Sequence, residues 1–318
     1  MTSELLAVAD HRAGVGLFDT ASFEHVETIA VPPEPHELAF DPARRLLYAT
    51  ITYRSGFYGS EAKASELVVI DVDRRSADVV DLAPEHAPHG IVVRGDLVYV
   101  SVEAGPAGEG GLLVIDAGTR KVVDRIATGA PGPHWFALTP DGAKAYVSNK
   151  EAPFVSVVDL ASCEVVGRIP VPSSEGLAMT PDGRRVFVAS PMFGREPGPG
   201  DLGIRVIDTA AGEVVQVLEV GGQVIPVHVT ADGTLLAAEV AHDGGRVNVY
   251  EPDSLALRGS VDVGVFPLTL HSSPDGSRAY AANGGSGTVS VVDLKTLRVT
   301  ATMNVSAGSA HGLAIIPA

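Results

Sequence analysis

Four histidines stand at the same distance before a turn in different parts of the chain. In the stretch GPHWFALTPDG, a histidine lies five residues ahead of the threonine that opens a Thr-Pro-Asp-Gly turn. Seven segments of the chain have an equivalent position where this turn begins. Five residues before that position stand His36, His89, His134, Glu175, Ile225, Leu268 and His311. The chain has only 10 His among 318 residues, so four of them in one register of seven positions indicate a function.

Neutral imidazoles that converge with a carboxylate are typical transition-metal ligands. Nitrogen-rich donor sets suit iron, copper, zinc, nickel or manganese, whereas calcium and magnesium prefer oxygen. The sequence therefore predicts a site for iron, copper or zinc held by His36, His89, His134, His311 and Glu175. Fewer than six protein ligands leave a position for water or substrate, as in catalytic sites. The alternative is that these histidines only cap neighbouring loops, a device that a repeat protein copies between repeats.

A repeat of about 45 residues must position these side chains. Its first part is an apolar run, a turn and a second apolar run, as in TPDGAKAYVS, TPDGRRVFVAS and SPDGSRAYAAN. A third run ends in an acid, as in VSVVDLA, and a fourth, such as KVVDRIATG, closes the unit. Because these acids recur in almost every repeat, we interpret them as turn residues. Four antiparallel strands per repeat predict one blade of a β-propeller.

The two ends of the chain predict how the ring closes. Residues 5–11, 14–20 and 25–32 resemble the second, third and fourth strands of a blade, and residues 310–318 resemble a first strand. Pairing these segments makes a seventh blade. The sequence thus predicts an all-β, seven-bladed propeller that forms a single domain over residues 1–318.

The repeats also resemble a known family. AYVSN followed by VSVVDL, FVAS followed by IRVIDT, and AYAAN followed by VSVVDL are similar to the repeats of YVTN-repeat (YncE-like) proteins. The resemblance covers nearly the whole chain and implies a seven-bladed propeller. It implies no single function, since relatives include surface-layer, DNA-binding and enzyme-associated propellers.

Other seven-bladed propellers are similar only in where they place a metal. Carotenoid cleavage oxygenases hold iron by four histidines at the axis, and nitrous oxide reductase holds copper by propeller histidines. Streptogramin lyase uses His and Glu with a divalent ion. These comparisons imply that a propeller can hold a metal ion at its axis. They leave both lyase and oxidoreductase activity open for this protein.

Longer loops are expected on the histidine side of the ring. In a propeller, the loops after the second strand emerge on the face where the first strands begin, and here they include TYRSGFYGSEAKAS and SPMFGREPGPGD. A small, partly apolar organic substrate is therefore expected at this mouth of the channel. The predicted substrate contacts are Tyr53, Tyr58, Trp135, Phe193, Ile225 and Leu268.

Three glutamates are the predicted catalytic residues. Glu175 is a proton acceptor if it does not bind the metal. Glu103 and Glu239 end second strands near the rim, so each is a general base or a hydrogen-bond partner of a ligand histidine. His228 and His271 lie three residues further along their strands than the register position, and we interpret them as packing residues.

Composition excludes several functions. A formal net charge of −16 and a pI near 4.9 argue against nucleic acids and anionic membranes. The sequence shows neither an apolar run of membrane-spanning length nor a secretory signal, and its single cysteine, Cys163, forms no internal disulfide. A cytoplasmic protein is expected, with its oligomeric state undetermined.

The sequence leaves three functions in competition. The first is a metal-dependent lyase, isomerase or oxidoreductase acting on a small molecule. The second is a non-catalytic propeller that binds a protein or peptide on the same face. The third is a lactone hydrolase, because lactonases also occur on seven-bladed propellers, although no diagnostic motif supports it.

Overall fold

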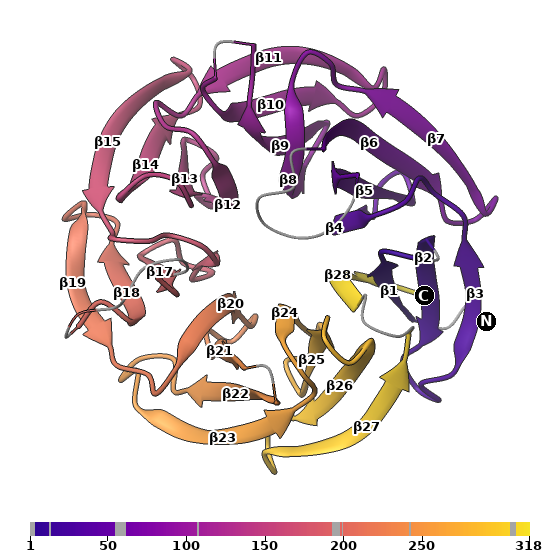
Figure 1. The fold of residues 1–318 in the computed structure, drawn as a ribbon, viewed down its shortest axis with the longest axis vertical. Coiled ribbons are helices and arrows are strands. Elements are labelled where there is room, and N and C mark those ends of the chain that lie inside the picture. Colours follow the sequence, from indigo (N-terminus) through magenta and orange to yellow (C-terminus); the bar gives the residue numbers. More distant parts are fainter. Residues whose placement is uncertain are drawn as a thin grey trace.

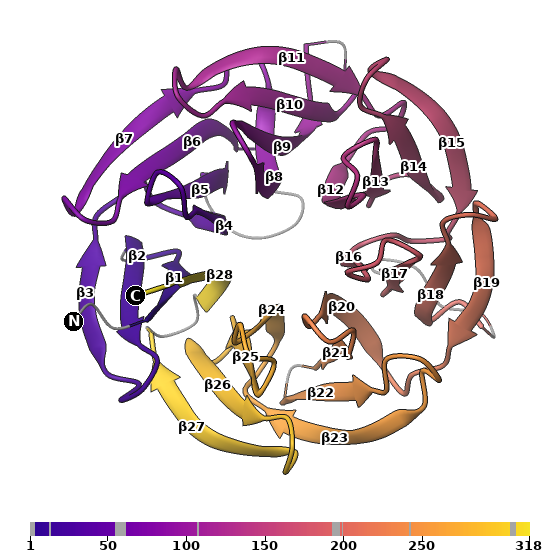
Figure 2. The same ribbon diagram turned by 180° about the vertical axis from the view of Figure 1, so that it is seen from behind.

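The structure has seven four-stranded antiparallel sheets. Figures 1 and 2 show from the two faces that the sheets are arranged in a ring. The computed structural model describes residues 4–12, 14–54, 62–106, 108–192, 198, 200–241, 243–305 and 310–318. In each blade the chain runs from the innermost strand outward. The prediction of an all-β, seven-bladed propeller is confirmed.

Each blade takes its four strands in chain order, except the last. Blade one is β4 (Pro35–Asp41), β5 (Leu46–Tyr53), β6 (Lys63–Asp71) and β7 (Ser76–Asp81). Blade two is β8 (His86–Arg94), β9 (Leu97–Ala104), β10 (Gly111–Asp116) and β11 (Lys121–Ala127). Blade three is β12 (Pro133–Leu138), β13 (Lys144–Asn149), β14 (Phe154–Asp159) and β15 (Glu164–Pro170). Blade four is β16 (Leu177–Met179), β17 (Arg185–Ser190), β18 (Gly203–Asp208) and β19 (Glu213–Leu218).

Blade five is β20 (Gln223–Val229), β21 (Leu235–Val240), β22 (Gly245–Tyr250) and β23 (Leu257–Val263). Blade six is β24 (Pro267–Ser272), β25 (Arg278–Asn283), β26 (Thr288–Asp293) and β27 (Arg298–Asn304). Blade seven joins the two ends of the chain: β28 (Ala310–Ile316), β1 (Leu5–Asp10), β2 (Gly14–Asp19) and β3 (His25–Ile29). The pairing of β28 with β1 closes the ring as predicted.

The core lies between neighbouring blades. One buried cluster joins Ala7 and Val15 of blade seven to Leu47 and Val68 of blade one, and similar clusters fill other junctions between blades. Small and β-branched side chains suit this packing because the middle strands of the blades are almost entirely buried, as in β17 and β25. The outermost strands are mostly exposed, with a few partly buried residues, as in β7 and β19. Among the described residues, no helix is long and apolar enough to cross a membrane.

The repeated acids act at turns, as the sequence indicates. Asp159 ends β14, and its Oδ1 accepts hydrogen bonds from the backbone N–H groups of Ala161 and Ser162. Asp208 and Asp293 make the same pair of contacts after β18 and β26. These carboxylates satisfy turn N–H groups at the start of the connection to the outermost strand. These aspartates therefore recur because each blade needs the same turn, and not because they take part in catalysis.

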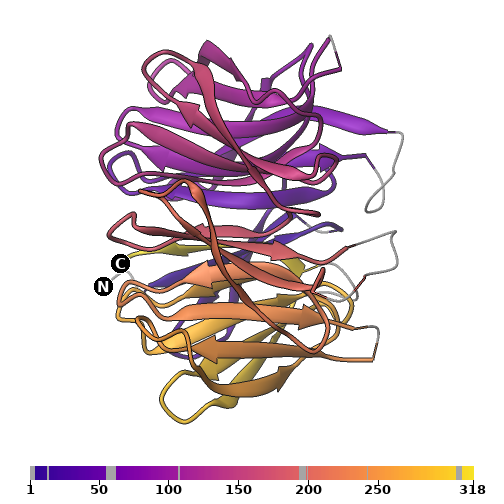
Figure 3. The ribbon, with the colours of Figure 1, turned by 90° about the vertical axis from the view of Figure 1, so that its left-hand side faces the viewer.

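Figure 3 shows the ring edge-on, with the C-terminal end of the chain at the left face. The innermost strands end at that face in tight turns, in which Thr139 and Asp141 or Thr180 and Asp182 bond to each other. The innermost strands begin at the opposite face. The predicted metal ligands belong to these strand starts, and the structure places them at one level of the channel.

Candidate metal centre

A β-bulge interrupts innermost strands where the predicted ligands stand. In β4, Pro35 lies opposite Ile51 but Leu38 lies opposite Ala49, so the stretch containing His36 has one residue more than its partner. The same irregularity occurs at His89, His134 and Ile225, and register also shifts at Leu268 and His311. A bulge releases a residue from the ladder and redirects its side chain. Bulges at equivalent positions of the innermost strands thus direct the side chains there toward the channel axis.

The inner strands approach each other closely beside the bulges. A Cβ atom on Gly312 would lie 2.2 Å from the carbonyl oxygen of His36, and one on Gly176 would lie 2.0 Å from the carbonyl oxygen of Ile225. Only glycine fits at such contacts between backbones. This approach carries the flanking side chains toward the axis from several blades.

The four predicted histidine ligands meet at the axis. The ring centroids of His36 and His311 are 3.8 Å apart, and those of His89 and His134 are 3.5 Å apart. The two pairs join where His36 Nε2 lies 2.9 Å from His89 Nε2. All four side chains are buried, with exposed fractions of 1 to 4%. Residues more than 40 positions apart in the sequence therefore form one cluster.

A fifth histidine, which sequence reasoning missed, completes the cluster. His11 follows β1, and its ring stacks 5.5 Å from that of His36 and 5.3 Å from that of His311. Its Nδ1 lies 3.4 Å from a carboxylate oxygen of Glu34. The loop after β1 emerges on the face where the innermost strands begin, which is the one signal that points to His11. We call His11, His36, His89, His134 and His311 the histidine hub.

Two buried carboxylates border the hub. Glu175 Oε1 lies 3.5 Å from His134 Nε2, so the structure brings this predicted ligand to the cluster. Glu37 Oε1 lies 3.3 Å from His311 Nδ1, and sequence reasoning did not select it. Burial raises the pKa of Glu37 well above its usual value. A buried carboxyl group beside several imidazoles is a further donor for a cation.

Burial keeps the hub imidazoles neutral. It lowers the pKa of His11 and His311 to about 3, and that of His36, His89 and His134 well below the ordinary value of 6.5. The neighbouring imidazoles add to this effect because protonated rings would repel each other. At neutral pH the ring nitrogens are therefore free of the extra proton that would block metal binding.

Two hub nitrogens lack a hydrogen-bond partner among the described residues. Nδ1 of His89 and Nδ1 of His134 are buried, and neither makes a hydrogen bond. Buried polar atoms are almost always paired, and an orphan of this kind points to an ion or ligand. The hub therefore offers donors that the protein itself does not use.

The stability of the protein is expected to fall as the pH drops below 6.5. Unfolded histidines take up protons near their ordinary pKa of 6.5, whereas His11 and His311 in the folded protein resist protonation down to about 3. Acidification therefore favours the unfolded state, by about 2 kcal/mol for each of these two residues at pH 5. Urea unfolding at pH 7.5 and pH 5 measures this loss.

Two histidine variants test whether the buried histidines cause this loss of stability at low pH. In a His11→Asn variant, the free energy of unfolding should depend less steeply on pH, because one of the two histidines that resist protonation is gone. Replacement of His25, which is exposed on β3, should leave the dependence unchanged. An unaltered pH dependence in His11→Asn would contradict the assignment.

A second polar cluster lies against the hub. The Tyr53 hydroxyl donates to Glu103 Oε1 at 2.7 Å, and Lys150 Nζ donates to the Tyr53 oxygen at 2.8 Å and also pairs with Glu103. The Tyr53 ring stands edge-on to His36, with centroids 5.8 Å apart. Glu103 therefore connects to the hub through Tyr53, and the contacts of its Oε1 are with Tyr53 and Lys150.

The remaining predicted residues separate into three groups. Ile225 and Leu268 line the same small space as four hub histidines and form its apolar side. Glu239 instead accepts a hydrogen bond from Asn248 at 2.6 Å within blade five. Tyr58 and Phe193 lie outside the described residues.

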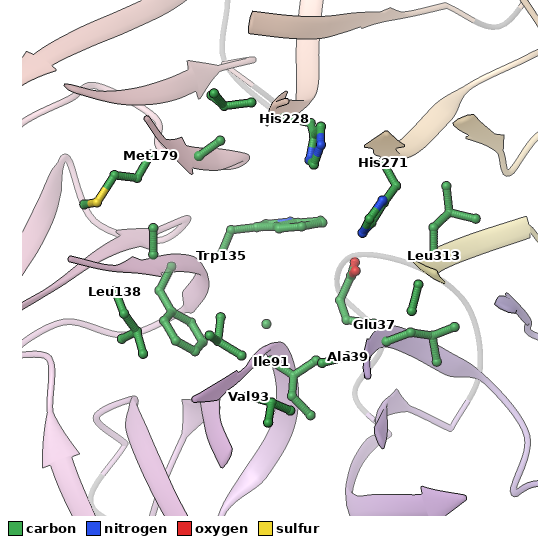
Figure 4. Close-up of a pocket in the computed structure, with 18 of the residues that line it drawn as sticks. Glu37, Ala39, Ile91, Val93, Trp135, Leu138, Met179, His228, His271 and Leu313 are labelled. Carbon is green, nitrogen blue, oxygen red and sulfur yellow. The ribbon is translucent and has the colours of Figure 1, made fainter. Parts of the chain in front are cut away.

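The channel widens beyond the hub into a cavity of about 770 Å³. Figure 4 shows its walls of Ile91, Val93, Leu138 and Leu313, with the indole of Trp135 projecting into it. The turn prolines at the ends of the innermost strands line it, so it lies toward the face opposite the strand starts. Packed imidazoles fill the channel at the level of the hub, and the open volume is left on this other side.

Trp135 lies between the two regions. It lines the cavity and also the small space beside the hub, and its ring is 6.2 Å from that of His89. His228 and His271, interpreted from the sequence as packing residues, also line the cavity, with their rings stacked 5.2 Å apart. The offset of three residues brings them to the cavity level because the bulges change the alternation along the inner strands.

Comparisons with known proteins support the fold. No protein-family model matches the chain. It is 25% identical over 300 residues to the seven-bladed beta-propeller protein Rv1057 of Mycobacterium tuberculosis, covering 74% of this chain and 72% of the relative.

Two solved structures are similar in fold. Hydrazine synthase from Kuenenia stuttgartiensis gives a TM-score of 0.69 at 16% identity, over 92% of this chain and 98% of that one. A functionally unknown protein from Desulfotomaculum acetoxidans gives 0.75 at 13% identity, over 99% of both chains. The chain is thus a seven-bladed β-propeller, similar over nearly its whole length to these structures.

Proposed function

We propose that the histidine hub binds a transition metal ion, and that the protein is a metal-dependent enzyme acting on a small, partly apolar organic molecule. The convergence of neutral, buried imidazoles from four consecutive blades beside Glu175 carries this proposal. A cluster of this kind suits iron, copper or zinc. The ligands are drawn from His36, His89, His134, His311 and Glu175, and His11 adds a donor.

The metal would supply a Lewis acid or an oxygen-binding centre. The protein residues around it hold protons and orient the donors. Glu175 lies beside His134 and accepts a proton when it is not a ligand. Glu103 accepts a hydrogen bond from the hydroxyl of Tyr53, whose ring stands edge-on to His36. Lys150 balances the charge of the Glu103 carboxylate.

The substrate lies in the channel cavity in this proposal. A volume of about 770 Å³ with apolar walls accommodates a small organic molecule. Trp135 and Glu37 stand at the end of the cavity nearest the hub, since each lines the cavity and also contacts or borders hub residues. The apolar part of the substrate would contact Ile91 and Leu138, and its polar end would face the hub. This places the substrate on the other side of the hub from the longer loops.

Cobalt(II)-loaded protein is expected to change its visible spectrum when azide is added. A catalytic metal site keeps a coordination position open for an external ligand, whereas a structural site is closed by protein donors. A titration of the cobalt bands with azide measures binding at that position. A His36→Ala/His89→Ala variant serves as the control without the site.

A spectrum that stays unchanged while cobalt is bound would contradict an enzymatic role. The non-catalytic alternative, a propeller that binds a protein or peptide, would then account better for a closed, structural metal.

We propose further that the chain is a YVTN-repeat protein of the cytoplasm that acts on small molecules rather than on nucleic acid or membranes. The repeat pattern supports the family, the single cysteine supports the location, and the acidic charge supports the choice of partner.

A further inference from the structure

Two groups of three buried donors, which share His36, lie at the hub. The first donor group is His11, His36 and His311, and the second is His36, Glu37 and His89. Within each group the ligand atoms lie within 4.8 Å of one another. We infer that the hub holds two metal ions side by side, one in each donor group, which rests on the proposed metal function and extends it.

The geometry of the second donor group fits a shared ion. His36 Nε2 and His89 Nε2 are 2.9 Å apart. Two nitrogens that are each about 2.05 Å from one ion, at a right angle, are about 2.9 Å from each other. Glu37 adds an oxygen donor, and the pair formed by His134 and Glu175 flanks this group through the ring contact between His134 and His89.

The first donor group lies on the side of blade seven. His311 comes from β28 and His11 from the loop after β1, and both rings stack near that of His36. His36 belongs to both groups. A neutral imidazole offers one free nitrogen, so to bind both ions the His36 ring would release its N–H proton to solvent and bridge them as an imidazolate. One ion has room for at most six donors at short distance, whereas five histidines and two carboxylates surround this space.

Carboxylates are placed to offset the charge of two cations. Glu34 lies beside His11, Glu37 beside His311, and Glu175 beside His134. Carboxylates next to ligand histidines orient the rings and strengthen their donation to a metal. Two divalent ions bring four positive charges, of which these three side chains offset most.

The number of ions bound per chain tests the inference. Full-length, untagged protein is dialysed against zinc(II) and the bound zinc is measured by mass spectrometry. Wild type should bind two ions per chain, and His11→Asn and His89→Asn should each bind one. His25→Asn, which alters an exposed histidine, should still bind two. Circular dichroism establishes that each variant is folded.

The outcomes separate the inference from the proposed function. One ion in wild type, or two ions in folded His11→Asn, would overturn the two-ion inference and leave a single metal site standing. No ion in wild type would overturn both.

Copper(II) gives a second readout that needs no variant. Two adjacent copper ions should couple, so that the electron paramagnetic resonance signal per copper falls when loading rises from one ion to two. A signal that grows in proportion up to two ions would overturn the inference.

Discussion

A His36→Ala/His89→Ala variant is expected to lose its bound metal while keeping the propeller fold. The two side chains supply a nitrogen pair only 2.9 Å apart, and His36 belongs to both donor groups. Without them, neither group retains three donors, so we expect affinity to fall by about 100-fold or more. Dialysis against zinc followed by metal analysis measures the loss.

The control variant also replaces two histidines with alanine. His25 and His86 are exposed, and a His25→Ala/His86→Ala variant should bind metal as wild type does. Retention of full metal content by the His36→Ala/His89→Ala variant would show that the metal sits elsewhere. Circular dichroism and the melting temperature report whether the blades remain assembled.

Metal binding is expected to raise the melting temperature of wild-type protein by about 6 °C for each ion at a free concentration 1,000 times its dissociation constant. Such an excess stabilises the folded state by about 4 kcal/mol, and the unfolding entropy of a chain of this length converts 1 kcal/mol to about 1.5 °C. The physical reason is that the ion would link strands of different blades, such as β4 of blade one, which carries His36, and β28 of blade seven, which carries His311. Blade seven is the one that closes the ring.

Differential scanning calorimetry with and without a chelator measures this shift. The His36→Ala/His89→Ala variant should melt at the same temperature in both conditions. Equal melting temperatures for metal-treated and chelator-treated wild type would contradict a metal bound inside the ring.

The repeated pattern was sufficient to predict the fold. Every blade carries the same order of apolar runs and turns, so the strand count and the closure by residues 310–318 followed from the sequence. The register also selected His36, His89, His134 and His311, because equivalent positions in a ring lie at equivalent distances from its axis. Those four side chains do meet in the structure.

Residues outside the repeat register could not be found in this way. His11 stands in the loop after β1, outside the repeated positions at the starts of the innermost strands. Glu37 directly follows His36 in a bulge. A bulge changes which way successive side chains point, so simple alternation misplaces Glu37, His228 and His271. Contacts between side chains were equally hidden: Glu239 engages Asn248 in its own blade, and Glu103 engages Lys150 and Tyr53.

The position of the cavity was hidden as well. Loop length indicated the face where the innermost strands begin, but the packed imidazoles fill the channel there. The open volume lies at the other end because small and apolar side chains, such as Ala39 and Val93, line the channel beyond the hub. Which end of a propeller channel is open depends on side-chain volume and packing.

The most direct test of the account is the metal content of the native protein, purified without a histidine tag and then reconstituted separately with iron, copper and zinc. We predict at least one tightly bound ion per chain for one of these metals, lost in the His36→Ala/His89→Ala variant. Wild-type protein that stays free of metal after all three treatments would contradict the central claim that the histidine hub is a metal centre.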